Sequence, residues 1–254
     1  MREFHSVSHV LDAPGLRLVL IRGVPTPWSE AAKGIFHVKG LDCIYGAQSE
    51  DEPPNAIQTA FGDSSVPVAL YEREKPRTGW AEILILAERL TDSVPLIPAG
   101  AEGRVELFGV AHEICGELGL GWSYRLFMIG DPEADDVAGS FPKPLRQHLA
   151  GKYGYNAKHA SAALRRVTGT LRMLSERLER SDFLVGDQLS VADIYWATFA
   201  NLIIPLPEAD MPAVDMIRRA YTCEDERVLE AISDRLRDHQ RRIYDEYLEL
   251  PVPL

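Results

Sequence analysis

Residues 17–40 read RLVLIRGVPTPWSEAAKGIFHVKG, and this stretch decides the fold because an apolar strand runs directly into an amphipathic helix. The strand pattern covers residues 16–22 and the helix pattern covers residues 28–39. Amide groups in the first turn of a helix have no intrahelical partner and carry partial positive charge. The corner between the two elements therefore predicts a place where an anion, such as a thiolate, is stabilised.

Two hydroxyl residues occupy this corner. Thr26 and Ser29 stand at the positions that a Cys-x-x-Cys redox pair would take, so dithiol electron exchange is disfavoured. A second interpretation of Thr26 is purely structural, since a threonine followed by Pro27 is a common helix start. The sequence alone leaves both interpretations of Thr26 open.

Composition limits the classes of function. The chain has 254 residues, 46% of them hydrophobic, and a formal net charge of -11. An acidic protein is disfavoured for sequence-independent binding to nucleic acid or to an anionic membrane, so we expect neither partner. The three cysteines, Cys43, Cys115 and Cys223, are isolated, which fits a reducing compartment. With no secretory start and no membrane-length apolar run, we expect a cytoplasmic protein.

The chain divides near a stretch rich in proline and glycine. We expect an α/β domain over residues 1–92, a linker over residues 93–103 and an all-helical domain over residues 104–254. In the first domain, a strand at residues 66–71 and a helix at residues 80–89 predict a mixed sheet. In the second, apolar residues recur at helical spacing over residues 156–180 and 225–248, which predicts a helical bundle.

Two short motifs add detail. Val66-Pro67 opens a strand, and Pro67 there is either an edge residue or a cis-proline that leaves neighbouring backbone groups free for a peptide-like ligand. Ser190 and Asp193 have the spacing of a capping box at a helix start, for which we expect a structural role.

Taken in order, these segments resemble the glutathione S-transferase family. The resemblance rests on the Thr26-Pro-Trp-Ser corner, on Val66-Pro67, on the helix over residues 81–90 and on the motif over residues 183–193. It implies a thioredoxin-like N-terminal domain followed by a helical-bundle C-terminal domain. It also implies a cytosolic homodimer that acts as a transferase of the kind used in detoxification.

The resemblance further implies glutathione as co-substrate. Its sulfur would lie near Thr26, which would donate a hydrogen bond to the thiolate and would not act as a covalent nucleophile. The implied glutathione-binding residues are Thr26, Trp28, Ser29, Val66, Pro67, Thr78 and Gly79. An electrophile would bind along residues 106–127, near Phe108, His112, Trp122 and Tyr124.

The chain departs from the family pattern at one turn. Thr78-Gly79 stands where the family has Glu-Ser, and the usual acid that meets the glutathione amino group is absent, unless Glu82 or a residue of a partner subunit replaces it. Two hypotheses follow. One is a glutathione transferase that conjugates, reduces or cleaves a small hydrophobic electrophile, and the alternative is a non-catalytic binding or scaffold protein.

No metal site is predicted. His112 and Cys115 lie one helical turn apart, but no second pair accompanies them, so packing is the favoured interpretation. The acidic run over residues 131–136 lacks the glycine and the final glutamate of a calcium loop, which favours a solvated loop.

Overall fold

The computed structural model describes residues 3–48, 51–53, 55–136 and 141–254. The chain forms two compact units. Unit 1 comprises Met1–Leu96, Pro207–Ala213 and Tyr244–Leu254, and unit 2 comprises Ile97–Leu206 and Val214–Ile243. Unit 1 is therefore assembled from three separate segments of sequence.

A three-stranded mixed sheet lies at the centre of unit 1. The strands are β1 (Leu16–Leu20), β2 (Ile44–Ala47) and β3 (Val68–Tyr71), in the order β2-β1-β3. Strand β1 runs parallel to β2 and antiparallel to β3. All five residues of β1 are buried, as the central position of this strand requires, and four of them are apolar. The predicted mixed sheet is confirmed, and β2 is a strand that the sequence pattern did not reveal.

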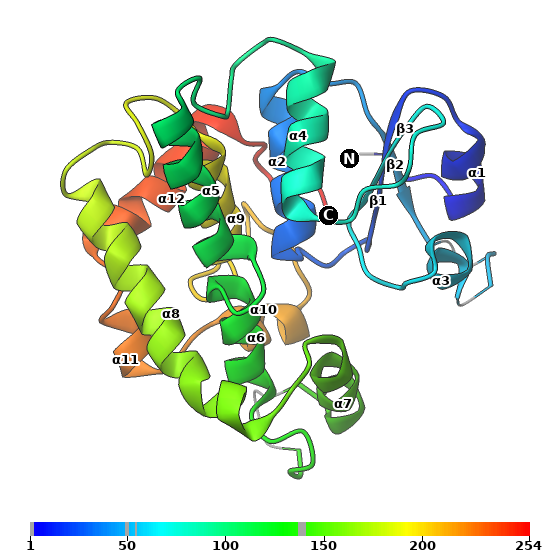
Figure 1. Ribbon diagram of the computed structural model, residues 1–254. Coiled ribbons are helices and arrows are strands. Elements are labelled where there is room, and N and C mark those ends of the chain that lie inside the picture. Colours follow the sequence, from blue (N-terminus) through cyan, green and yellow to red (C-terminus); the bar gives the residue numbers. More distant parts are fainter. Residues whose placement is uncertain (1–2, 49–50, 54, 137–140) are drawn as a thin grey trace. The chain divides into compact units, whose positions relative to one another are not determined.

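Four helices flank this sheet. They are α1 (Val7–Asp12), α2 (Pro27–Val38), α3 (Ala56–Phe61) and α4 (Trp80–Leu90). Helices α1 and α3 lie on one side of the sheet, and α2 and α4 pack against each other on the other side (Figure 1). Helices α2 and α4 match the sequence expectation, whereas α1 and α3 are each only six residues long and carry no clear periodic signal.

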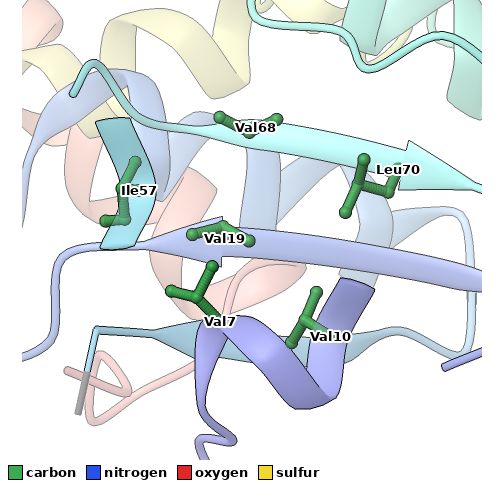
Figure 2. Close-up of a cluster of buried hydrophobic side chains, with 6 residues drawn as sticks. All are labelled: Val7, Val10, Val19, Ile57, Val68 and Leu70. Carbon is green, nitrogen blue, oxygen red and sulfur yellow. The ribbon is translucent and has the colours of Figure 1, made fainter. Parts of the chain in front are cut away.

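A small hydrophobic cluster joins α1 and α3 to the sheet (Figure 2). Its buried members are Val7, Val10, Val19, Ile57, Val68 and Leu70. Helix α1 is further held at its start by the Glu52 carboxylate, which accepts hydrogen bonds from the Val7 and Ser8 amides at 3.0 and 2.9 Å. The segment before β1 is thus an integral part of unit 1.

Unit 2 is helical, as the sequence predicts. Its helices are α5 (Ala101–Cys115), α6 (Leu120–Ile129), α7 (Lys143–Lys152), α8 (Ala157–Leu178), α9 (Val191–Ala200), α10 (Asp215–Tyr221), α11 (Glu226–Leu229) and the first part of α12 (Asp234–Tyr247). The predicted apolar face of α8 is buried, with Val167, Leu171 and Leu174 fully covered. Among the described residues, no helix combines the length and apolar character needed to span a membrane.

The single helical pattern over residues 225–248 is corrected by the structure to two helices. The chain breaks between Leu229 and Asp234, because each part has its own start. The Asp225 carboxylate accepts the Arg227 amide hydrogen bond at 3.0 Å, and the Ser233 hydroxyl accepts that of Leu236 at 3.1 Å. Two caps in one amphipathic stretch divide it without changing its apolar face.

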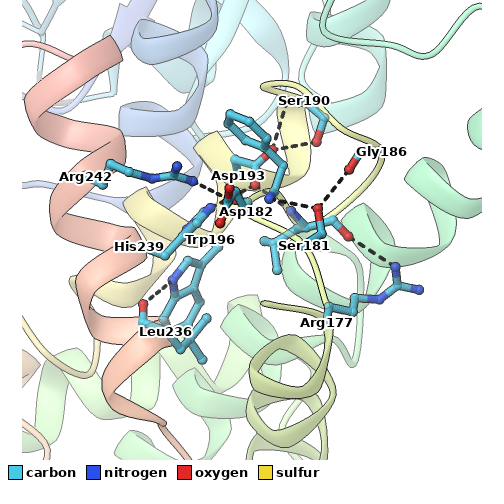
Figure 3. Close-up of polar contacts among 12 residues, drawn as sticks. Arg177, Ser181, Asp182, Gly186, Ser190, Asp193, Trp196, Leu236, His239 and Arg242 are labelled. Carbon is cyan, nitrogen blue, oxygen red and sulfur yellow. Dashed lines mark hydrogen bonds and ion pairs between the residues drawn. The ribbon is translucent and has the colours of Figure 1, made fainter. Parts of the chain in front are cut away.

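Helix α9 is buried along its whole length, and Asp193 anchors its start (Figure 3). One carboxylate oxygen accepts hydrogen bonds from the Ser190 amide and hydroxyl at 2.9 and 2.8 Å. The other accepts the Leu184 amide at 2.8 Å and lies 3.0 Å from Nε2 of His239. The structural interpretation of Ser190 and Asp193 agrees with these contacts, and His239 is a partner that sequence spacing could not reveal.

Candidate functional site

The Thr26 side chain does not act as a helix cap, although Thr26 occupies the N-cap position of α2 and Pro27 is the first helical residue. Its Oγ1 instead donates a hydrogen bond to Oγ of Ser29 at 2.6 Å. Thr26 is partly exposed, whereas Ser29 is only 1% exposed. Of the two hydroxyl residues at the corner, Thr26 is thus partly accessible to solvent and Ser29 is not.

The turn of α2 that follows is also polar and buried. Glu30 and Lys33 form an ion pair of 2.8 Å, with side chains 6% and 5% exposed. Nζ of Lys33 also donates to the carbonyl oxygen of Pro253 at 2.5 Å. Neither Glu30 nor Lys33 is among the residues that the sequence predicts for the site. The signal for this pair was an acid and a base three residues apart on the helix that follows the corner.

Val66-Pro67 is a cis peptide bond, so the cis alternative is the one observed. Strand β3 also lies at the edge of the three-stranded sheet. The register pairs Val68 with Val19, which sets Pro67 beside Leu20, the last residue of β1. The cis bond therefore lies at the end of the sheet from which the chain leads to Thr26.

Thr78-Gly79 returns to the same end of the sheet. Arg77 pairs with Ala69 through two backbone hydrogen bonds of 2.8 and 2.9 Å, and the antiparallel direction then carries Thr78 and Gly79 back toward Pro67. Gly79 is the N-cap residue of α4 and Thr78 is exposed. Unit 1 thus brings three predicted segments, around Thr26, Val66 and Thr78, to one end of its sheet.

Glu82 is already engaged at this turn. Its Oε2 accepts a hydrogen bond from the Gly79 amide at 3.2 Å, which is the half of a capping box that the N3 residue supplies at the start of α4. A Cβ on residue 79 would also lie 3.2 Å from that oxygen, a close contact that suits glycine. The Glu82 carboxylate, which the sequence offered as a partner for the glutathione amino group, therefore binds a backbone amide at the start of α4.

The arginine beside the turn pairs with an acid. Arg77 and Arg89 both hydrogen bond to the carboxylate of Glu74, the latter at 2.8 Å. The hydrogen bond from Arg89, and after it the one from Arg77, lowers the pKa of Glu74 below its ordinary value. Because Arg89 lies in the last turn of α4, the Arg77 side chain reaches away from the N-terminus of that helix. Thr78 is thus the side chain at this turn that is open to a ligand.

The four residues considered for an electrophile site have different environments in unit 2. Phe108 is half-buried, and Trp122 is half-buried and donates its indole N–H to the carbonyl of Tyr153 at 3.1 Å. Tyr124 is buried, and this burial raises its pKa well above the ordinary value. His112 is exposed and lines a pocket of about 390 Å³ together with Glu113, Arg165 and Arg166.

The metal alternatives carry no support from the described residues. They contain no group of three or more side chains suited to hold a metal ion. Burial raises the pKa of the Cys115 thiol, which fits a packing role. In the acidic loop, Asp136 pairs with Arg146 at 3.1 Å and Glu133 pairs with Lys143 at 3.6 Å, so α7 neutralises part of its charge.

Comparisons with known proteins agree with this fold. Residues 131–213 match the family model described as glutathione S-transferase, C-terminal domain. The chain has the glutathione S-transferase fold. A thioredoxin-like mixed-sheet unit combined with a helical unit is the arrangement that this fold requires.

Solved structures with this fold cover nearly the whole chain. A glutathione S-transferase of Methylobacterium radiotolerans, in complex with glutathione sulfonate, matches 94% of this chain and 94% of its own, with a TM-score of 0.62 and 17% identity. A glutathione transferase family member of Pseudomonas fluorescens, with two glutathione bound, gives the same coverages and TM-score at 13% identity.

A glutathione S-transferase of Xylella fastidiosa matches 91% of this chain and 93% of its own, with a TM-score of 0.59 and 13% identity. None of the curated protein sequences matches this chain. At such low identities the similarity shows the glutathione S-transferase fold, and it assigns no role to the residues of the site.

Proposed function

We propose that the chain is a glutathione-dependent transferase whose glutathione site is the sheet end where the Thr26, Val66 and Thr78 segments meet. The observation that carries the proposal is Thr26, a partly exposed residue at the N-cap position of α2 whose hydroxyl is not used as a helix cap. The glutathione-bound neighbours support the choice of ligand. The acceptor is a small hydrophobic electrophile, and the active form is a cytoplasmic homodimer.

The roles follow from the position of each segment. The backbone of Val66 pairs with the peptide part of glutathione, and Thr78 with the α4 amides holds the γ-glutamyl carboxylate. Trp28, Pro67 and Gly79 complete the shape of the site, and the buried Ser29 lies behind Thr26 and supports it from the inner side. Thr26 donates a hydrogen bond to the sulfur after the thiol proton has left to solvent. The sulfur then forms a bond to the electrophilic carbon while the leaving group departs with its electron pair.

The energetics of thiol activation are within reach of these groups. Lowering a thiol pKa from about 8.5 to about 6.5 requires ~2.7 kcal/mol of preferential thiolate stabilisation. A hydrogen bond to a charged group contributes ~1.5 to 3 kcal/mol, and a helix N-terminus contributes ~0.3 to 1 kcal/mol. One hydroxyl on α2 is therefore sufficient without a metal or a second charge.

A non-catalytic binding protein is the second candidate, and one observation favours it. Glu82 is committed to the Gly79 amide, so the turn offers no side-chain acid of its own for the γ-glutamyl amino group. A protein that keeps the fold without that recognition would bind partners and not glutathione.

Calorimetric titration with glutathione separates the two candidates. The transferase proposal predicts saturable heat, and conjugation of an activated aryl chloride that falls at least tenfold in Thr26→Val. Thr59→Val, the same change at an exposed threonine of α3, is the matched control and leaves both unchanged. No heat at millimolar glutathione would contradict the transferase proposal and favour the binding protein.

A further inference from the structure

The two hydroxyls of the corner differ in burial and in partners. Thr26 is partly exposed and its Oγ1 lies 2.6 Å from Oγ of Ser29. Ser29 is buried, and the described part of the chain gives its Oγ no hydrogen-bond partner other than Thr26. The backbone between them is fixed, because the Glu30 amide donates to the Thr26 carbonyl at 2.9 Å as the first helical bond. The pair is therefore rigid and closed on its inner side.

The direction of this hydrogen bond matters. A hydroxyl has one proton to donate and can accept two hydrogen bonds. When Thr26 donates to Ser29, Thr26 offers only lone pairs to a ligand, and the Ser29 proton is left buried without an acceptor. Rotation of both hydroxyls reverses the bond while every heavy atom stays in place. The reversed bond satisfies the Ser29 proton and frees the Thr26 proton to point outward.

We infer that Ser29 is a positioning residue for Thr26, donating to Thr26 Oγ1 so that the Thr26 proton is directed at a bound thiolate. The inference rests on the proposed glutathione site. An anionic sulfur favours the reversed chain, since each hydroxyl then donates toward the negative charge. Hydrogen bonds in such a chain polarise one another, which strengthens each by ~10–30%. Ser29 therefore acts through Thr26 and has no contact of its own with the thiol.

The test measures two quantities on each variant of the full chain, namely the calorimetric affinity for glutathione and the pH profile of its ultraviolet thiolate absorbance. In Ser29→Ala we expect the pKa of the bound thiol to rise by ~0.5 to 1 unit, which is a roughly three- to tenfold loss of thiolate at pH values well below that pKa. Affinity measured well below that pKa, where the thiol is protonated, should stay within about twofold, because no other contact of glutathione is removed.

Three variants show whether Ser29 acts through Thr26. Thr26→Val should raise the bound-thiol pKa by more than Ser29→Ala, and adding Ser29→Ala to Thr26→Val should change nothing further. Thr26→Ser keeps the hydroxyl and should stay near the parent value. Ser123→Ala removes an equally buried serine of unit 2, whose hydroxyl bonds to the Leu118 carbonyl, and should leave the profile unaltered.

Failures of the two proposals can be told apart. If the parent protein gives no heat with glutathione, the proposed function fails, and the positioning role of Ser29 fails with it. If the parent binds glutathione and lowers the thiol pKa, but Ser29→Ala keeps the parent pH profile of thiolate absorbance, only the positioning role of Ser29 is overturned. An additive effect of Ser29→Ala in the Thr26→Val background would also overturn it, because Ser29 would then act on the thiol by another route.

Discussion

At the scale of single residues, the starts of helices α2 and α4 in unit 1 use their polar side chains in different ways. Thr26 occupies the N-cap position of α2, but its hydroxyl forms a hydrogen bond with Ser29. At the start of α4, the Glu82 carboxylate accepts a hydrogen bond from the Gly79 amide. Gly46 matters for a different reason, because the space around it does not admit a side chain. A Cβ at residue 46 would lie 2.4 Å from Cγ2 of Val10 in α1.

Replacement of Gly46 by alanine tests how tightly α1 is packed on the sheet. We expect Gly46→Ala to lower the free energy of unfolding by ~1 to 3 kcal/mol, because the added methyl group overpacks a buried contact. Urea denaturation followed by circular dichroism provides the measurement. Gly109→Ala, in the interior of α5 with open space around it, is the matched control and should be stabilising by up to ~1 kcal/mol. An unchanged stability of Gly46→Ala would show that α1 shifts without cost.

Glu82 gives a residue-scale test of ligand recognition. Glu82→Gln keeps an acceptor for the Gly79 amide but removes the charge that an ammonium group would need. We expect the dissociation constant for glutathione to change by less than about twofold, because the carboxylate serves the helix start. Isothermal calorimetry measures it. A tenfold or greater loss of affinity would instead assign Glu82 to the γ-glutamyl amino group.

At the scale of elements, helix α9 depends on one carboxylate that gathers four donors. Asp193 is fully buried and links the loop before α9 to α12 through His239 (Figure 3). Trp196 adds a second link, since its indole N–H donates to the Leu236 carbonyl at 3.1 Å. A buried acid of this kind stabilises the fold only while all of its partners are present.

Loss of Asp193 should therefore be costly. We expect Asp193→Ala to lower the free energy of unfolding of the chain by ~3 kcal/mol, because buried amide and hydroxyl donors lose their acceptor. Thermal and urea denaturation would measure the change. Asp182→Ala is the matched control, since that acid is exposed and paired with Arg235, and it should change stability by less than ~1 kcal/mol. Equal effects of the two substitutions would contradict the anchoring role of Asp193.

At the scale of the whole molecule, residues that are distant in sequence complete unit 1. The segment Tyr244–Leu254 belongs to that unit, and the carbonyl of Pro253 accepts a hydrogen bond from Lys33, 220 positions earlier. The Val252 amide bonds to the Asp210 carbonyl at 2.6 Å, which ties in the third segment of the unit. Helix α2 is therefore in contact with a segment that lies far from it in sequence.

Lys33 also allows a test of the buried ion pair next to this contact. Lys33→Met removes the ammonium group from the buried Glu30 carboxylate, and we expect it to lower the free energy of unfolding by ~3 to 5 kcal/mol. Adding Glu30→Leu should recover much of that loss, because two apolar residues of suitable size replace the ion pair. Urea denaturation of both single variants and the double variant measures the coupling. Additive losses would show that the two side chains do not act as a pair.

Much of the fold was predictable from the sequence because its signals are local. The apolar strand and amphipathic helix around Thr26, the strand after Pro67 and the buried face of α8 all follow from periodicity and caps within one element. Helices α1 and α3 and strand β2 were missed, since each is too short for a periodic pattern and is stabilised by neighbours. The break between α11 and α12 was missed because the apolar stripe continues across it.

By itself, the sequence determined that a strand-to-helix corner with Thr26 and Ser29 in place of cysteines is followed by a helical bundle. It could do so because hydrophobic spacing and the residues of a first helical turn are properties of contiguous chain. Only the tertiary structure decided which groups of the corner are free to act. Pairing of Arg77 with Ala69 returns Thr78 to the end of the sheet near Pro67. Ser29 is buried while Thr26 stays partly exposed, and a contact with the Gly79 amide occupies Glu82. Those outcomes depend on strand register and on packing between distant segments, which no local pattern encodes.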